Sequence, residues 1–166
     1  MKNNEIFVYI IDTCSIIDLS KLYPQDVFLE LWKNIDKLIK NERLVSHKFV
    51  LDELKKKFDE AYKWVKIRKS MFVDITSQQI EIIKDILAKY PELVDPEKEI
   101  DADPWLIALA LEKEEQQKLV PIVKVKIIVT EEKLKPNKVN LPFVCQEFKI
   151  ECIDLIGLMR KEGWKW

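Results

Sequence analysis

Glycine is almost absent from this chain. The 166 residues include only Gly157 and Gly163, and both lie near the carboxyl end. A phosphate-binding loop or a dinucleotide-binding fingerprint needs several glycines between a strand and the helix that follows it. The sequence therefore excludes both kinds of nucleotide site.

Histidine and cysteine are also scarce. The chain has one histidine, His47, and three cysteines without a Cys-x-x-Cys pair. Zinc fingers and histidine-based metal centres need more of both residues. An odd number of cysteines in a lysine-rich chain is typical of a reducing compartment, so we expect a cytoplasmic protein.

Long hydrophobic runs are missing as well. The apolar residues 6–11 end at Asp12, and this run is too short for a signal sequence or a membrane span. We therefore expect no membrane contact. The length is typical of one domain with its own core, so residues 1–166 are predicted to form a single domain.

The net charge of −1 provides no overall attraction to nucleic acid, but the charges are unevenly distributed. Residues 33–69 contain twelve Lys or Arg against six Asp or Glu, whereas residues 71–120 contain five against twelve. An acidic pocket beside a basic surface suits a metal-dependent enzyme that acts on a polyanion. The triplet 55–57, taken alone, is better explained as the solvated face of a helix.

Apolar strands alternate with amphipathic helices along the whole chain. This alternation predicts an α/β fold, a three-layer α/β/α sandwich with a central parallel sheet of four to five strands. The expected strands are 6–11, 43–46, 72–75, 122–129 and 150–153, and the expected helices are 15–22, 24–40, 48–70, 76–90, 103–118, 143–148 and 154–162. The acidic segment 91–101 is expected to be an exposed loop.

Four acids occupy equivalent places in this pattern. Asp12 and Glu132 each follow an apolar strand, Glu53 lies in the first turns of the helix after the second strand, and Asp103 begins a helix at Pro104. Parallel strand ends and the helix starts that follow them meet at one edge of the sheet. Carboxylates gathered there raise one another's pKa unless a cation neutralises them. An all-oxygen site suits Mg²⁺ or Mn²⁺, which would activate a water for attack on a phosphodiester.

Each acid also has a simpler interpretation. Asp12 could only cap the next helix, and Glu53 could be one of many solvated charges. Asp103 is expected to be an N-cap, with Pro104 at the first helical position. Glu132 could be an ordinary polar residue after a strand, and Asp101 competes with Asp103 for the site. The combination of four acids is more specific than any one of them.

Four segments resemble the motifs of the PIN domains, the nucleases similar to the PilT N-terminus, and most of all their VapC-type toxin branch and its uncharacterised relatives. Residues 9–19 are similar to the opening hydrophobic-Asp-Thr/Ser stretch, and 45–54 to the second-strand serine and glutamate. Residues 103–110 resemble the Asp-x-x-Ile-Ala-x-x-Ala helix, and 128–132 the Val-Thr-x-Asp segment. The resemblance spans about residues 7–158.

The resemblance implies a PIN-like fold and metal-dependent cleavage of RNA by an endoribonuclease. Carried over by position, Asp12, Glu53, Asp103 and Glu132 would be the catalytic acids that hold Mg²⁺ or Mn²⁺, with Thr13, Ser15, Thr130 and Asp101 as supporting residues. VapC-type members are toxins of type II toxin–antitoxin pairs, silenced by a cognate antitoxin and often dimeric. An RNA substrate, an antitoxin and a homodimer are therefore the expected partners.

This sequence departs from the family pattern in two places. Ile107 comes one residue later than usual, after an uncommon Pro104-Trp105, and the fourth acid is Glu132 rather than an aspartate. The longer glutamate arm could reach a metal through water.

Other functions remain open at this stage. A catalytically silent PIN-like domain that binds RNA or a partner protein would use the acids only as caps and solubilising charges. A haloacid-dehalogenase-type phosphatase also begins with a strand-end aspartate, but it needs a second aspartate where this chain has Cys14. The terminal Trp164 and Trp166 would pack on the body, contact a partner or stack on a base.

Overall fold

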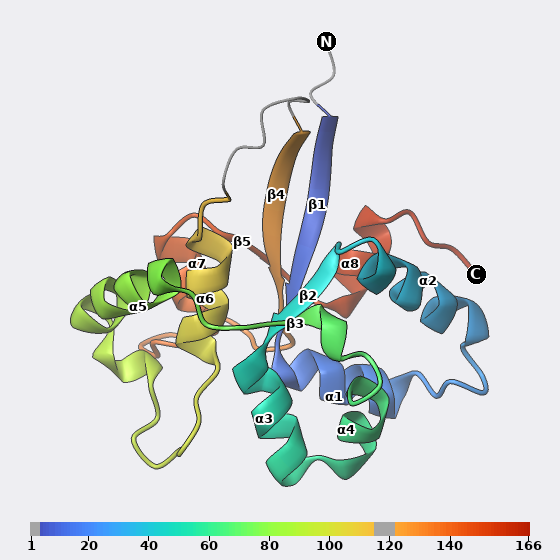
Figure 1. Cartoon of the computed structure of the whole chain (residues 1–166), viewed down its shortest axis with the longest axis horizontal. Coiled ribbons are helices and arrows are strands. Elements are labelled where there is room, and N and C mark those ends of the chain that lie inside the picture. The colour runs from blue at the N-terminus through green and yellow to red at the C-terminus, as the bar shows by residue number, and fades with distance from the viewer. Residues whose placement is uncertain (1–3, 115–121) are drawn as a thin grey trace.

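Five parallel strands form one central sheet in the order β3-β2-β1-β4-β5 (Figure 1). The structure is a computed structural model that describes residues 4–114 and 122–166. The strands are β1 (Asn4–Ile11), β2 (Leu44–His47), β3 (Phe72–Val73), β4 (Ile122–Val129) and β5 (Glu151–Ile153). The predicted parallel sheet is confirmed, and it has the larger of the two expected numbers of strands.

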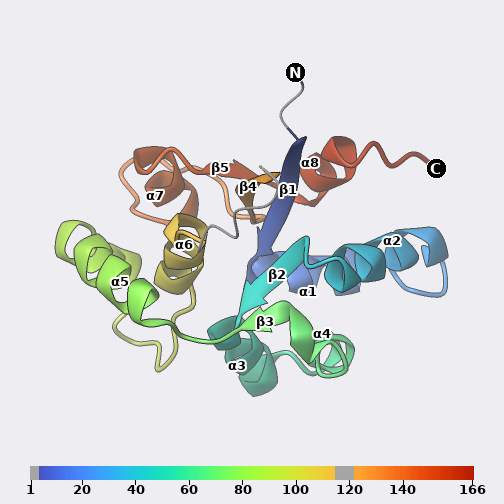
Figure 2. The same cartoon turned by 45° about the horizontal axis from the view of Figure 1, so that its top comes forward.

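Helices cover both faces of this sheet, as Figure 2 shows. One face carries α5 (Ser77–Lys89), α6 (Asp103–Leu111) and α7 (Leu141–Glu147), and the other carries α1 (Thr13–Leu22), α2 (Leu29–Lys40) and α8 (Leu155–Lys161). The helix α3 (Lys48–Lys57) lies beyond the carboxyl end of β2, and α4 (Asp59–Val65) packs against α3 and α1. The described residues also contain the 3-10 turns η1 (Lys69–Met71) and η2 (Pro91–Leu93). The predicted three-layer α/β/α sandwich is therefore confirmed. No helix in residues 4–114 or 122–166 is both long and apolar enough to cross a membrane.

The sheet's centre explains why β1 and β4 are so apolar. Their last three residues, 9–11 and 127–129, have no exposed surface, and the two strands pair along all eight residues. The helix α6 packs against β1, β2 and β4, and Leu106, Ile107 and Ala108 are fully buried. Strands buried on both faces need continuous apolar runs rather than alternation.

Two helix boundaries differ from the prediction. The helix expected at residue 24 begins at Leu29, because Pro24 opens a turn in which its carbonyl accepts the N–H groups of Val27 and Phe28 at 3.1 and 2.9 Å. The helix expected over 48–70 breaks at Phe58, whose φ of −137° and ψ of 70° are not helical. The break allows α4 to place Trp64 against Trp32 of α2, with ring centroids 4.9 Å apart.

Smaller differences occur elsewhere. The helix expected over 103–118 ends at Leu111, and residues 115–118 lie outside the described residues. Strand β2 runs one residue later than predicted, and the loop after α5 begins with the 3-10 turn η2, which buries Leu93. The helix expected over 76–90 is confirmed as α5, and it starts with a capping box in which Thr76 and Gln79 bond each other's backbone N–H.

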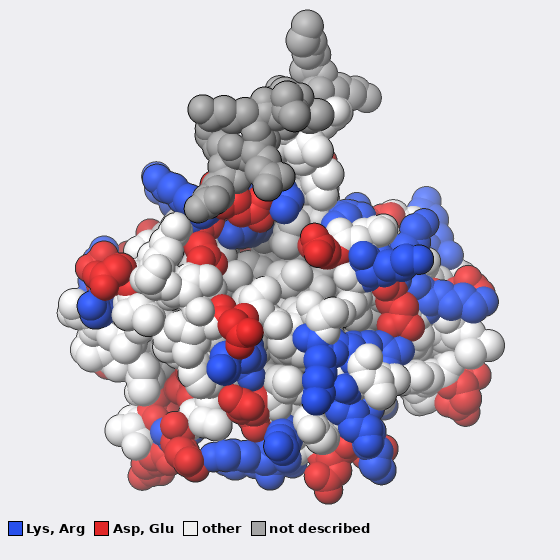
Figure 3. All heavy atoms as spheres, viewed as in Figure 1, with Lys and Arg blue, Asp and Glu red and all other residues white. Residues whose placement is uncertain are grey.

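The surface charges follow the uneven distribution found in the sequence. In Figure 3, basic side chains are denser over the half that holds α2 and α4, and acidic ones are more frequent over the half that holds α5 and α6. Both signs occur on each half, so this face carries no uniformly basic patch.

Candidate active site

The register of the two central strands brings Asp12 and Thr130 together. Ile11 pairs with Val129, and the Asp12 N–H donates to the Val129 carbonyl at 3.0 Å. The first residues after both strands are therefore level with each other, and the Thr130 hydroxyl donates to the Asp12 carboxylate. This contact places the candidate site at the carboxyl edge of the sheet, as predicted.

Asp12 caps a helix and also faces the site. Its Oδ1 accepts the Ser15 N–H at 2.8 Å, as the N-cap of α1, and its Oδ2 accepts the Cys14 thiol at 3.0 Å. Only 3% of Asp12 is exposed. Burial raises the pKa of its carboxyl from 3.8 to about 6, although the bonds from Cys14, Thr130 and Ser15 oppose this shift.

The predicted supporting residues hold the acids in place. Ser15 also bonds the end of β4, because its hydroxyl donates to the Val129 carbonyl at 3.2 Å. Thr13 donates its hydroxyl to the Glu53 carboxylate. Both residues therefore link the start of α1 to its neighbours.

Glu53 is not a free solvated charge. Besides the bond from Thr13, its Oε1 accepts the Ala102 N–H at 3.0 Å. One carboxylate of α3 thus ties together the starts of α1 and α6. A helix start has unsatisfied N–H groups, which explains why an acid from another element is used there.

Asp103 is not the N-cap that the sequence predicted. It is the first residue of α6, and the capping position belongs to Ala102, whose φ of −80° and ψ of −20° are already helical. Asp101 takes the bonding role instead, because its Oδ1 accepts the Asp103 N–H at 3.2 Å and its Oδ2 accepts the Asp95 N–H at 3.0 Å. The carboxylate of Asp103 is left free of a capping bond.

Mutual repulsion among these acids is strongest at Asp103. Burial raises the pKa of Asp103 well above its usual range, and the charges of Glu132, Asp101, Asp12 and Glu53 raise it further, in that order. Within the described residues, neither the Asp103 nor the Glu132 carboxylate has a hydrogen-bond donor or an ion-pair partner. These two acids are therefore the ones in need of a positive charge.

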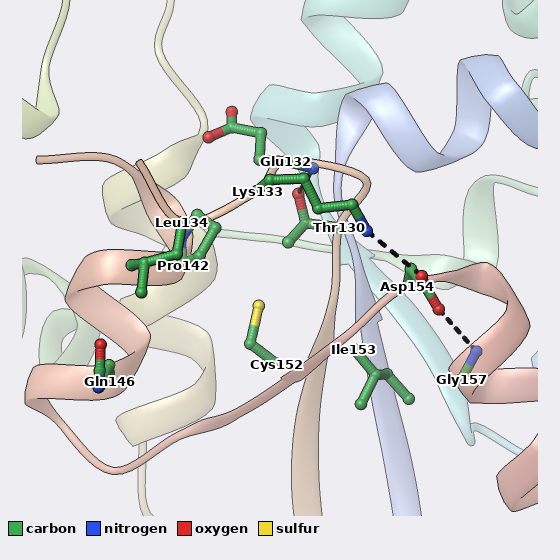
Figure 4. Close-up of a pocket in the computed structure, with 10 residues that line it drawn as sticks. All are labelled: Thr130, Glu132, Lys133, Leu134, Pro142, Gln146, Cys152, Ile153, Asp154 and Gly157. Carbon is green, nitrogen blue, oxygen red and sulfur yellow. Dashed lines mark hydrogen bonds and ion pairs between the residues drawn. The ribbon is translucent and has the colours of Figure 1, made fainter. Parts of the chain in front are cut away.

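Glu132 lies where the chain turns away from β4. Its N–H donates to the Thr130 hydroxyl at 3.1 Å, and Figure 4 shows its carboxylate pointing away from Cys152 and Ile153. Through this turn, Thr130 positions both Asp12 and the backbone of Glu132.

All four predicted acids line one pocket of about 480 Å³. Asp12, Glu53, Asp103 and Glu132 reach it from four separate parts of the chain, whereas Asp101 is not among the lining residues and accepts the Asp103 N–H instead. The basic side chains in the wall were not predicted as site residues, although the triplet 55–57 and the lysine within the acidic loop were visible signals. The remaining lining residues are Thr13, Cys14, Ile17, Lys56, Lys57, Phe58, Glu97, Lys98, Glu99 and Ile100.

The chemistry of this pocket fits a divalent cation held by oxygen atoms. Four carboxylates around one space, two of them without a donor, match the ligands that Mg²⁺ and Mn²⁺ prefer. As the side chains stand, however, no three Asp, Glu, His or Cys residues in the described parts of the chain are close enough to hold an ion. Asp12 and Glu53 are fixed by protein donors, whereas the Asp103 and Glu132 carboxylates are not, so any closure around a cation would have to come from these two.

A second hollow of about 450 Å³ lies on the other side of the Thr130–Glu132 turn (Figure 4). Two of its three charged groups, Lys133 and Asp154, already have partners, and the third, Glu132, also lines the first pocket. Lys133 lies 3.4 Å from the Asp154 carboxylate, and Asp154 caps α8 by accepting the Gly157 N–H at 2.8 Å. These contacts stabilise the start of α8. The candidate site is therefore the first pocket, which the four acids line.

His47 does not line the pocket. It is fully buried as the N-cap of α3, and its Nε2 lies 3.1 Å from the Gln79 Oε1. The terminal Trp164 and Trp166 lie against each other, with centroids 6.1 Å apart, and Trp166 is 65% exposed. Of the three roles left open for these tryptophans, packing on the body is confirmed for Trp164, which lies against the hydrophobic core, and neither residue lines the pocket.

No curated protein matches the chain. A chain of the crystal structure of VapBC2 from Rickettsia felis bound to a DNA fragment from their promoter is similar to it, with 15% identity and a TM-score of 0.48 over 89% of this chain and 98% of that chain. The family model described as "Domain of unknown function (DUF4411)" matches residues 9–166. This protein therefore belongs to the DUF4411 family.

Proposed function

We propose that this protein is a metal-dependent endoribonuclease of the PIN type. One observation carries the proposal: four acids from four separate segments line a single pocket at the carboxyl edge of a parallel sheet. Helix capping alone does not account for all four of these acids. Here Asp103 and Glu132 cap nothing, and their charges raise the energy of the metal-free site.

The proposed cofactor is Mg²⁺ or Mn²⁺, and it would be held by Asp12, Glu53, Asp103 and Glu132. When bound, such an ion supplies Lewis-acid activation of a water and neutralises charge on the phosphodiester. The chain's own residues set the geometry. Thr130 and Ser15 orient Asp12, and Thr13 orients Glu53, so that two acids are fixed before an ion arrives.

The wall of the pocket suits a polyanionic substrate. Lys56, Lys57 and Lys98 line the same space as the acids, where their ammonium groups would contact phosphates next to the one that is cleaved. Desolvation lowers the pKa of Lys98, but the combined charges of Asp101, Asp103, Glu53 and Asp95 outweigh it and raise the pKa, so this side chain remains charged. We take RNA as the substrate because the four sequence motifs resemble those of PIN nucleases.

A toxin role rests on the same sequence resemblance to the VapC-type branch. It implies a cognate antitoxin protein as partner, a homodimer and a cytoplasmic location. A ribonuclease of the same chemistry could serve RNA processing instead, so the antitoxin is sought only after cleavage has been established.

The deciding experiment is a cleavage assay on total cellular RNA with Mn²⁺, with Mg²⁺ and with EDTA. Wild type, Asp12→Asn and Asp103→Asn are compared with Asp85→Asn, which removes an exposed acid of α5. We expect discrete, metal-dependent products from wild type and Asp85→Asn, and a loss of at least about a hundredfold in both site variants because each removes a charged ligand. Cleavage by Asp12→Asn or Asp103→Asn at the wild-type rate would refute the assignment of the four acids.

The alternative function is a silent PIN-like domain that binds RNA or a protein. It is favoured by the hydrogen bonds that already occupy Asp12 and Glu53. Well-folded protein that cleaves no RNA under any of these conditions, and that Mn²⁺ does not stabilise, would establish this alternative.

A further inference from the structure

Trp105 and Phe49 form an aromatic surface next to the proposed nuclease site. Trp105 is partly exposed and, in contrast to Trp32, Trp64 and Trp164, it does not pack against the hydrophobic core of the described residues. It contacts two other rings instead. Its centroid lies 5.2 Å from that of His47 and 5.0 Å from that of Phe49.

The three rings of His47, Phe49 and Trp105 contact one another in pairs, and His47 is held rigidly among them. His47 and Phe49 lie 5.3 Å apart and nearly parallel, at 27°, and His47 is nearly parallel to Trp105, at 25°. His47 Nδ1 accepts the Phe49 N–H at 3.3 Å, so its Nε2 carries the proton and donates to Gln79. Gln79 in turn donates to Glu112 at 2.9 Å. The buried imidazole is thus a fixed floor under two partly exposed rings.

Sequence spacing places this surface beside the acids. Phe49 precedes Glu53 by one helical turn on α3, and residues four apart lie on one face, with Cβ atoms about 5–6 Å apart. Trp105, in the first turn of α6, contacts Phe49 and so joins this face of α3. The rings therefore lie one helical turn along α3 from Glu53, next to the residues that line the acidic pocket but not among them.

The ammonium group of Lys48 lies next to these rings. Lys48 Nζ lies 6.0 Å from the centroid of Phe49, and its contact with the exposed Asp74 is long, at 3.6 Å. Aromatic side chains combined with basic groups are the usual way in which proteins bind single-stranded nucleic acid without reading its sequence, because each base has a face that can stack.

We propose that Trp105, with Phe49, is a stacking site for an unpaired nucleobase, and that Lys48 contacts the phosphate of that nucleotide. The proposal rests on the proposed function for the identity of the ligand, a single-stranded RNA. In the nuclease, this site would hold the base adjacent to the cleaved bond and so favour unpaired substrates over duplexes.

Binding is measured without metal, in an Asp12→Asn background, so that the test does not depend on cleavage. The probe is a short fluorescent single-stranded oligoadenylate, followed by anisotropy in EDTA. Trp105→Ala is expected to weaken its affinity about five- to a hundredfold, which is the range for loss of one stacked base. Trp105→Phe should retain most of the affinity, and Trp166→Ala, which removes an exposed tryptophan elsewhere, should retain all of it.

Two further arms separate stacking from charge and from misfolding. An abasic oligomer of the same length should bind equally well with or without Trp105, whereas Lys48→Met should weaken the binding of both oligomers. Thermal unfolding of each variant confirms the fold, and Trp105→Phe keeps the site testable if the alanine variant is unstable.

The outcomes distinguish this proposal from the nuclease assignment. Equal affinity of Trp105→Ala and its parent, or no binding of the oligomer by the parent, would overturn the stacking site even if wild type cleaves RNA. Trp105-dependent binding without cleavage by wild type would support the stacking site and reject the nuclease. In an active enzyme, Trp105→Ala should raise KM for single-stranded RNA and leave kcat nearly unchanged.

Discussion

Asp12 shows how one residue can serve both a structural and a chemical role. One carboxylate oxygen caps α1, and the other receives the Thr130 hydroxyl and the Cys14 thiol. The two interpretations that the sequence left open, helix cap and site residue, are therefore compatible. What separates Asp12 from an ordinary cap is burial: the Gly157 N–H lowers the pKa of the more exposed cap Asp154, whereas desolvation raises the pKa of Asp12.

Replacing Asp12 by asparagine tests this dual role through stability. The amide oxygen can still cap α1, while the buried charge, whose pKa of about 6 against 3.8 corresponds to about 3 kcal/mol, is removed. In EDTA at neutral pH we expect Asp12→Asn to melt at or above the wild-type temperature.

Added Mn²⁺ should stabilise wild type by about 2–3 kcal/mol at a hundredfold excess over its dissociation constant, and should stabilise Asp12→Asn much less. Differential scanning calorimetry provides both comparisons, with Asp85→Asn as the control that should respond as wild type does. An equal response of Asp12→Asn to Mn²⁺ would place the ion elsewhere.

At the scale of elements, His47 joins β2 to α3 and α3 to α5. It ends the strand, caps the helix and bonds Gln79, which lies in the first turn of α5. Burial lowers the pKa of His47, and the charge of Lys48 lowers it further, while the bond to Gln79 and the charges of Asp74 and Glu112 oppose the shift. The neutral imidazole is thus the form that the fold favours.

This lowered pKa gives a pH dependence of defined sign. Below pH 6.5 the unfolded chain takes up a proton at His47 more readily than the folded protein, so stability falls as the pH drops from 6.5 toward the folded pKa. His47→Asn can keep the cap on α3 but does not titrate. Urea unfolding between pH 7.5 and 5 should show a steeper loss for wild type than for His47→Asn. Parallel curves for the two proteins would show that His47 has the same pKa in both states.

At the scale of the whole molecule, α6 connects the core to the candidate site. Its first residue contributes the acid Asp103, and Leu106, Ile107 and Ala108 are buried against the three central strands. A helix that is apolar on nearly all sides is held by its surroundings rather than by one amphipathic face. The position of Asp103 therefore depends on the packing of the entire sheet.

Two identical substitutions separate this packing from surface effects. Leu106→Ala empties a fully buried position and should reduce the free energy of unfolding by about 2–5 kcal/mol. Leu134→Ala, at a position that is 55% exposed, should change it by less than about 0.5 kcal/mol. Both are measured by urea unfolding at pH 7.5, where a small loss in Leu106→Ala would mean that α6 repacks.

The sequence by itself determined the layers of this protein and the edge of the sheet at which its acids lie. Apolar, β-branched runs can be stable only as buried strands, and a chain that alternates such strands with helices forms a parallel sheet. Because Asp12 and Glu132 follow two of these runs, their place at the carboxyl edge was predictable. The capping box that opens α5 also has a local signal, because it depends only on Thr76 and on Gln79 three residues later.

Only the tertiary structure decided how those acids are held. The helical break at Phe58 accompanies the packing of Trp64 against Trp32 of another helix. Glu53 accepts hydrogen bonds from Thr13 and Ala102, which lie 40 and 49 residues away in the chain. The helical backbone of Ala102 deprives Asp103 of the capping role, and the ring of Trp105 rests on His47 rather than on the core. Local patterns carry no record of such contacts, because each depends on side chains that folding brings together from distant parts of the chain.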